Sequence, residues 1–178
     1  QVQLKLQGHP DEGVITRCGW IFKEEVDQKD LYGVFLNGVH PQIKAGEIIR
    51  IREVNGQYSF AYKGVGIENT VTRRPHINIP IEETRAQELM TLYSRLATIT
   101  KRPRRMYERE IESGVSLSGT VYLCVDTVEE LGEFTELSMY VHEYASARRL
   151  LLEEAGRLGF RLSDIAEGNY LKMVTERR

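Results

Sequence analysis

The stretch that decides the fold is "GEIIRIREVNGQYSFAYKG", residues 46–64. It contains two runs of alternating apolar and polar side chains, separated by Asn55-Gly56, a dipeptide typical of the type I′ turn of a β-hairpin. Because successive side chains of a strand point to opposite faces, Arg50 and Arg52 share one face of the first run. The stretch therefore predicts an antiparallel hairpin with basic side chains gathered on one face.

The same alternation continues on both sides of this hairpin, in residues 1–6, 73–81, 100–111 and 120–141, the last read as two strands joined around Leu131-Gly132. The polar side chains expected to share a face within one strand are Gln1, Gln3 and Lys5; Arg74, His76 and Asn78; Arg102 and Arg104; Tyr122, Cys124 and Asp126; and Glu136 and Ser138. Helical spacing is found in residues 81–99 and 146–158, the second followed by Gly159 as a C-terminal stop. Strands and helices together predict an α+β fold.

The composition fits one globular domain that spans residues 1–178, with 41% hydrophobic and 28% charged residues. Cys18 and Cys124 have no metal-ligand spacing and form no disulfide framework, which favours a reducing cytoplasm. No apolar run approaches the roughly 18 to 20 residues that a membrane span needs, so we expect no membrane partner. The acidic run "KEEVDQKD", residues 23–30, is read as a solvated face. A net charge of −2 argues against nucleic acid as a partner, despite "KRPRR" at residues 101–105.

Seven basic side chains stand on the polar faces of these strands, against two carboxylates, Asp126 and Glu136. If the faces converge, the cations repel one another unless an anion lies among them, and a linear polyphosphate would supply that anion. Alternatively, the basic residues are the wet faces of an open sheet, where they discourage aggregation at the edges. Alternation leaves both interpretations open, because it relates side chains within a strand and does not show that the strands meet.

The order of these motifs resembles that of the CYTH superfamily, the triphosphate tunnel metalloenzymes, which include class IV adenylyl cyclases and thiamine triphosphatases. The family's ExExK, LRIR, YKGP and SRxExE are matched by "QVQLK", "IIRIR", "YKGV" and "RRPHIN". Its KxRRxY, SLDxVxGLGxFxEIE and SYxELL are matched by "RPRRMY", "YLCVDTVEELGEFTELS" and "NYLKMV". The resemblance spans nearly the whole chain in the correct order.

The resemblance implies a closed antiparallel tunnel of eight strands with helices packed outside, a closure that also removes unpaired edges. In the family, basic residues that line the tunnel hold a triphosphate, and carboxylates hold one or two divalent metals. The positions that match the phosphate-binding set are Lys5, Arg50, Arg52, Lys63, Arg74, Arg102 and Arg104. Asp126 and Glu136 match two of the metal-binding positions.

The chain departs from the family pattern on the acidic side. Five of seven carboxylate positions carry other residues, namely Gln1, Gln3, His76, Asn78 and Ser138. Mg²⁺ and Mn²⁺ prefer charged oxygen ligands. We therefore expect at most one weakly bound Mg²⁺ or Mn²⁺, at Asp126 and Glu136, and not a two-metal mechanism.

Two functions from different classes follow. The first, which we favour, is a sensor or sequestering module that binds a nucleotide, triphosphate or other phosphorylated ligand without a metal. The alternative is an active Mg²⁺- or Mn²⁺-dependent class IV adenylyl cyclase or a thiamine or inorganic triphosphatase, with His76 as a candidate base. The sequence leaves a homodimer open.

Overall fold

The computed structural model describes residues 1–35, 47–64, 71–113, 117–141 and 143–177, which form nine strands and four α-helices. The strands are β1 (Val2–Gln7), β2 (Ile21–Phe35), β3 (Ile48–Val54), β4 (Gln57–Lys63), β5 (Val71–Arg73), β6 (His76–Ile81), β7 (Tyr93–Ser113), β8 (Leu117–Val128) and β9 (Gly132–Met139). The helices are α1 (Glu12–Arg17), α2 (Glu83–Thr91), α3 (Tyr144–Arg157) and α4 (Tyr170–Thr175), with a 3₁₀ turn, η1, at Leu162–Asp164. None of these helices is long and apolar enough to cross a membrane.

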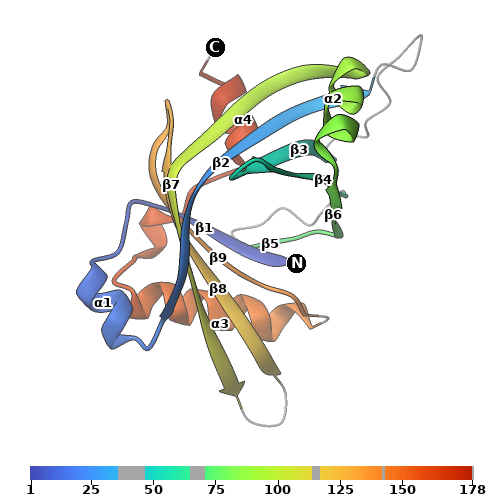
Figure 1. The fold of residues 1–178 in the computed structure, drawn as a ribbon. Coiled ribbons are helices and arrows are strands. Elements are labelled where there is room, and N and C mark those ends of the chain that lie inside the picture. Colours follow the sequence, from blue (N-terminus) through green and yellow to red (C-terminus); the bar gives the residue numbers. More distant parts are fainter. Residues whose placement is uncertain (36–46, 65–70, 114–116, 142, 178) are drawn as a thin grey trace.

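All nine strands belong to one antiparallel sheet, in the order β5-β1-β9-β8-β7-β2-β3-β4-β6, which curls into a half-barrel (Figure 1). The predicted α+β class is confirmed. The predicted closed tunnel of eight strands is not confirmed. The sheet has nine strands, and no hydrogen-bonded ladder of the described residues joins its edge strands β5 and β6. These two edge strands are instead linked through Arg74-Pro75, and the Gly64 amide donates to the Pro75 carbonyl at 3.0 Å. The chain itself passes from one edge of the sheet to the other.

The predicted hairpins are confirmed. β3 and β4 pair in register around Asn55 and Gly56, whose φ angles of 50° and 74° are positive, as a type I′ turn requires. β8 and β9 pair around the turn at Leu131-Gly132. These two hairpins form opposite walls of the half-barrel, because β7 and β2 lie between them in the strand order.

The helix predicted over residues 81–99 is wrong beyond Thr91, where α2 ends and β7 soon begins. The Tyr93 side chain explains the change. Its hydroxyl donates to the carbonyls of Leu31 and Ile49 at 3.2 and 2.7 Å, which fastens the start of β7 across β2 and β3. Gly33 permits this, because any Cβ there would collide with the Tyr93 ring. Tertiary pairing thus outweighs the local helical pattern.

The main core lies on the convex side of β1, β8 and β9. Leu4, Leu123 and Leu137 of these strands are fully buried and pack with Leu151 of α3. The predicted end of this helix before Gly159 is confirmed. Gly159 lies just after the C-cap of α3 and has a positive φ of 93°, which is typical of a glycine that ends a helix. α3 therefore packs outside the half-barrel, as expected (Figure 1).

Helix α4 lies differently, because it covers one end of the concave face. Tyr170 and Val174 of α4 pack with Ile99 and Phe134, which precede the cavity-lining Lys101 and Glu136 by two residues on β7 and β9. The concave face is thus apolar beneath α4 and polar beyond it. The candidate site lies at this boundary.

Candidate functional site

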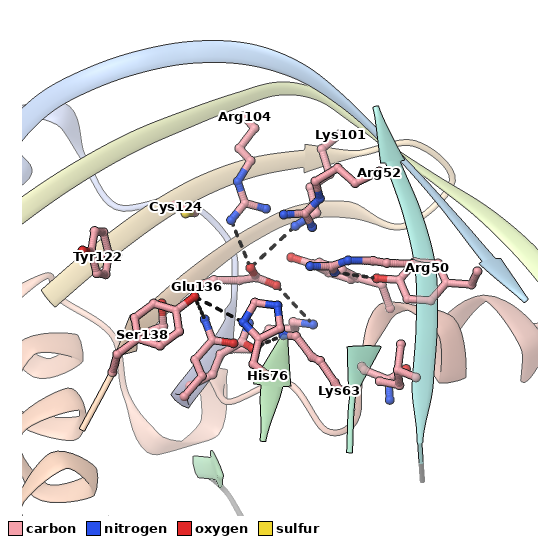
Figure 2. Close-up of a pocket in the computed structure, with 18 residues that line it drawn as sticks. Arg50, Arg52, Lys63, His76, Lys101, Arg104, Tyr122, Cys124, Glu136 and Ser138 are labelled. Carbon is pink, nitrogen blue, oxygen red and sulfur yellow. Dashed lines mark hydrogen bonds and ion pairs between the residues drawn. The ribbon is translucent and has the colours of Figure 1, made fainter. Parts of the chain in front are cut away.

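The concave face holds a cavity of about 390 Å³, within the range of roughly 300 to 1,000 Å³ typical of small-molecule sites. Six basic side chains line it, from β1, β3, β4 and β7: Lys5, Arg50, Arg52, Lys63, Lys101 and Arg104 (Figure 2). Among the described residues, three buried carboxylates pair with them, those of Asp30, Asp126 and Glu136. The site therefore carries a formal excess of three positive charges in a chain whose net charge is −2.

The structure brings five of the seven predicted phosphate-binding residues into this cavity. Arg74 lines an adjoining cavity of about 600 Å³, which shares Lys5 and Lys63 with the first. Arg102 lies outside both, with 62% of its side chain exposed and its Nε 2.8 Å from Asp27. The expectation that Arg102 and Arg104 share a face is wrong.

A bulge in β7 explains this error. Lys101 pairs with Val128 and Arg104 with Asp126, so that two residues of β7 oppose one residue of β8. The extra residue reverses the alternation and brings Lys101 into the cavity in place of Arg102. Pro103 marked an irregularity in the sequence, but it did not indicate which neighbour would turn inward.

Asp30 of β2 is a site residue that the sequence analysis missed. Asp30 is the last residue of the acidic run at 23–30, which was predicted to be a solvated face. Its side chain is fully buried and accepts from Nε and Nη2 of Arg52 at 2.7 and 2.8 Å. Nη1 of Arg50 lies 3.4 Å from it. Burial acts to raise the pKa of Asp30, but the charges of Arg50 and Arg52 outweigh it and hold the pKa well below its usual value. The two guanidinium groups are thereby fixed in the floor of the cavity.

A second cluster joins Lys5, Lys101 and Arg104 to Asp126 and Glu136. Lys101 Nζ lies 2.8 Å from Asp126 and 3.6 Å from Glu136, and Arg104 contacts both carboxylates at 3.4 and 3.3 Å. Burial acts to raise the pKa of Glu136, but the charges of Lys101, Lys5 and Arg104 hold it well below its usual value. Glu136 is therefore an ionised counter-charge to the three cations around it.

Tyr170 of α4 completes this cluster from the apolar end of the site. Its hydroxyl donates to Asp126 at 3.2 Å, and Lys5 Nζ lies 3.4 Å from the centre of its ring. Such a contact is a cation–π interaction. The C-terminal helix therefore helps to position a cation of the cavity.

Burial lowers the pKa of two lysines of the cavity, Lys63 and Lys5. Lys63 has no carboxylate within ion-pair distance among the described residues, and its Nζ donates to Gln3 Oε1 at 3.3 Å. Burial, with the charge of Arg50 in addition, lowers the pKa of Lys63 well below its usual value. Burial likewise lowers the pKa of Lys5 to about 8, although Glu136 opposes the shift. An anion in the cavity would favour the charged forms of both.

The residues expected at metal positions do not fit a metal ion. Asp126 is fully buried outside the cavity lining, and Glu136 is held by three cations that would repel a divalent ion. Across the described ranges, no three His, Cys, Asp or Glu side chains are grouped to hold one. Of the substituted positions, Gln1, Gln3, His76 and Ser138 line the cavity, whereas Asn78 is exposed on β6 outside it.

Comparisons with known proteins agree with this fold. No family model matches the chain. The curated protein named "Putative adenylate cyclase MJ0240" from Methanocaldococcus jannaschii is 24% identical over 180 residues, with 97% of each chain covered. A conserved hypothetical protein from Pyrococcus furiosus has a TM-score of 0.77 at 22% identity, over 96% of this chain and 98% of its own.

A plant structure is similar as well. The "Putative adenylyl cyclase HpAC1 from Hippeastrum", reported to reveal a dominant triphosphatase activity, has a TM-score of 0.60 at 13% identity. The likeness covers 99% of this chain and 94% of that one. At these identities the solved structures show a shared fold.

Proposed function

Because its motifs, fold and curated relative together support assignment to the CYTH superfamily, we propose that this chain binds the triphosphate of a nucleotide or related ligand without requiring a metal. The observation that carries the proposal is the excess of three positive charges in one cavity, with Lys63 unpaired by any carboxylate of the described residues. Crowded, partly desolvated cations are stabilised by an anion among them.

The cavity offers the two kinds of group that phosphates bind. Arg50 and Arg52 present planar guanidinium groups already fixed by Asp30, so that little side-chain freedom is lost on binding. Lys5 and Lys63 present ammonium groups that can each contact an oxygen of the chain of phosphates. Neutral side chains at Gln3 and at other positions where the family has carboxylates favour an anion further.

A metal-dependent cyclase or triphosphatase is the second candidate, and the names of the relatives favour it. Among the described residues, Glu136 is the carboxylate that lines the cavity. An Mg²⁺ or Mn²⁺ ion would supply charge neutralisation at the phosphates, and the substrate's own oxygens would have to provide most of its ligands.

Affinity and turnover measured with and without metal separate the two candidates. We expect ATP and inorganic tripolyphosphate to bind in EDTA with an affinity close to that in Mn²⁺, and no pyrophosphate or phosphate to be released. Binding only in Mn²⁺, together with product release, would contradict metal-free binding and support the enzyme. Isothermal calorimetry and a phosphate-release assay on the same preparation provide both readouts.

A further inference from the structure

The second cavity, of about 600 Å³, lies at the edge of the sheet that β5 forms. Thr72 of β5 pairs with Gln3 of β1, and both residues line this cavity. Arg148 and Leu152 line it as well, although they belong to α3, which packs on the convex side of the sheet. The cavity therefore lies where the concave face meets the outside of the molecule, and its volume is typical of a small-molecule site.

The segment between α3 and α4 forms a fixed wall of the second cavity. The Ala166 amide donates to the Lys5 carbonyl at 3.0 Å, and Ile165 forms a β-bridge with Leu6. At the end of the segment, the Asn169 side chain caps α4 by accepting from its backbone at 2.9 Å. The wall is thus held by hydrogen bonds at both of its ends, so a ligand meets a preformed surface.

The inner part of the second cavity is cationic. Its charged lining among the described residues is Lys5, Lys63, Arg74 and Arg148 against one carboxylate, Glu167. Arg74 is buried, at 8% exposed, whereas Glu167 lies at the surface. Lys63, which lines both cavities, has no carboxylate of the described residues within ion-pair distance. This inner part therefore attracts an anion.

The outer part of the second cavity is apolar. Leu162 of η1 is 76% exposed although its side chain is large and apolar, and Leu152 of α3 is only partly buried. Ile165 and Ala166 continue this apolar lining inward, toward the strand that carries Lys5. A hydrocarbon group that covers the two leucines would remove apolar surface from water, which favours its binding.

Basic and apolar side chains thus lie at different depths of one cavity, with Arg74 and Lys63 inside and Leu162 at the opening. A ligand that matches this order has an acidic head and a short apolar body. A polyphosphate offers nothing to cover the leucines, and a neutral hydrocarbon leaves the basic groups without a counter-charge.

We propose that the second cavity binds a single-chain amphiphilic anion, a carboxylate or phosphate monoester on a short hydrocarbon chain, with its head at Arg74 and Lys63 and its chain along Leu152 and Leu162. Because Lys5 and Lys63 line both cavities, this head and a triphosphate use the same ammonium groups. Each ligand therefore weakens the binding of the other, by the same factor in both directions. This antagonism rests on the proposed triphosphate site, whereas the amphiphile site itself does not.

Calorimetry in EDTA on the full chain tests the inference, with octanoate and octyl phosphate as probes. Acetate has the acidic head alone, and octanamide has the chain with a neutral head. We expect octanoate or octyl phosphate to bind at least about tenfold more tightly than either of these, and the comparison of the two probes identifies the preferred head. A saturating concentration of the tighter probe should weaken inorganic tripolyphosphate by about fivefold or more.

Two variants at exposed positions affect the second cavity alone. Leu162→Ser should weaken the amphiphile by about threefold or more and leave tripolyphosphate unchanged, and Leu92→Ser, at an exposed leucine outside both cavities, is its control. Arg148→Gln should weaken the amphiphile by about twofold to fivefold, with Arg149→Gln, at the next position of α3 outside the lining, as its control.

Lys63→Met tests the sharing of one ammonium group by the two cavities. This variant should weaken both the amphiphile and tripolyphosphate, because Lys63 lines both sites. Loss of tripolyphosphate binding alone would contradict the position of the acidic head.

The remaining outcomes separate this inference from the proposed function. Octanoate and octyl phosphate that bind no more tightly than acetate and octanamide, or that lose equal affinity in Leu162→Ser and Leu92→Ser, overturn the amphiphile site and leave the triphosphate site standing. An amphiphile that binds without weakening tripolyphosphate overturns the antagonism. A chain that binds the amphiphile as described but no tripolyphosphate overturns the proposed function, while the amphiphile site stands.

Discussion

Arg52 and Asp30 form a two-point ion pair at the floor of the cavity, with Nε 2.7 Å from Oδ1 and Nη2 2.8 Å from Oδ2. The two residues stand directly opposite each other on β3 and β2, so the pair also ties these strands together. Because Arg50 contacts the same carboxylate, one negative charge pairs with two guanidinium groups, of which that of Arg50 is buried and that of Arg52 is partly exposed. Asp30 therefore stabilises the folded protein as well as positioning the arginines of the site.

Asp30→Asn is therefore expected to lower the free energy of unfolding by roughly 3 kcal/mol, since it leaves the buried Arg50 and the partly exposed Arg52 without their counter-charge. Urea denaturation at pH 7 measures the change. Asp27→Asn is the matched control, because Asp27 forms an exposed pair with Arg102, a kind of pair that contributes about 1 kcal/mol or less. Similar losses in both variants would show that the buried pair has no special role.

Lys63→Met tests the phosphate site with little damage to its surroundings, because no carboxylate of the described residues is left unpaired by the change. We expect the affinity for tripolyphosphate in EDTA to fall about tenfold or more, as for loss of a charge-assisted hydrogen bond. Arg102→Met removes an outward-facing cation and should leave the affinity unchanged in the same calorimetric titration. An equal effect of the two variants would indicate general attraction by net charge.

Glu136→Gln separates anion binding from metal binding by the sign of its effect. The Glu136 carboxylate opposes an incoming anion and occupies Lys5, Lys101 and Arg104. Its neutralisation should therefore strengthen tripolyphosphate binding in EDTA severalfold, at some cost in stability. Weaker binding in Mn²⁺, with no gain in EDTA, would instead identify Glu136 as a metal ligand. Glu129→Gln, at an exposed position, is the control.

The pH dependence of ATP binding follows from the lysines. Burial lowers the pKa of Lys5 in the free protein to about 8, so Lys5 is charged below that pH and increasingly neutral above it. ATP binds the charged form better, and its affinity should fall by up to about tenfold per pH unit as the pH rises from about 8 toward 10. The lowered pKa of Lys63 adds to the decline.

Lys5→Arg provides the control for this profile, since a guanidinium keeps its charge throughout the range and should flatten the fall. Calorimetry in a series of buffers gives the profile. An affinity that is constant across this range would show that neither lysine titrates in the binding equilibrium.

Strand faces could be predicted wherever the strands are regular. Arg50, Arg52 and Lys63 lie on the two strands that flank a turn, and the dipeptide Asn55-Gly56 predicts the type of that turn. The alternation of side chains along each strand then predicts that all three face the same side of the hairpin. Lys5 follows the same rule on β1. The convergence of these faces could not be predicted from alternation, because it depends on how the whole sheet curls, and only the resemblance to a known family indicated it.

The errors arise where long-range pairing changes the local pattern. The bulge in β7 exchanged Lys101 for Arg102, and the partner of Asp30 depends on a register between β2 and β3 that the sequence does not state. Tyr140 lies just beyond the last residue of β9, where alternation gives no guidance. Lys101 and Tyr140 nevertheless line the cavity, and Asp30 holds two of its arginines. Sequence patterns therefore predict the faces of regular strands better than they predict bulges, long-range pairs and strand ends.

The excess of positive charge in the cavity and the fixed positions of Arg50 and Arg52 affect different steps of binding. Attraction by the lysines and arginines acts over distance and governs how fast a polyanion arrives, so the association rate should fall as salt is added. Hydrogen bonds from the guanidinium groups of Arg50 and Arg52, which Asp30 holds in place, act only at short range and govern how long the molecule stays. The rate of encounter thus depends on the total charge of the cavity, and the residence time on the geometry around Asp30.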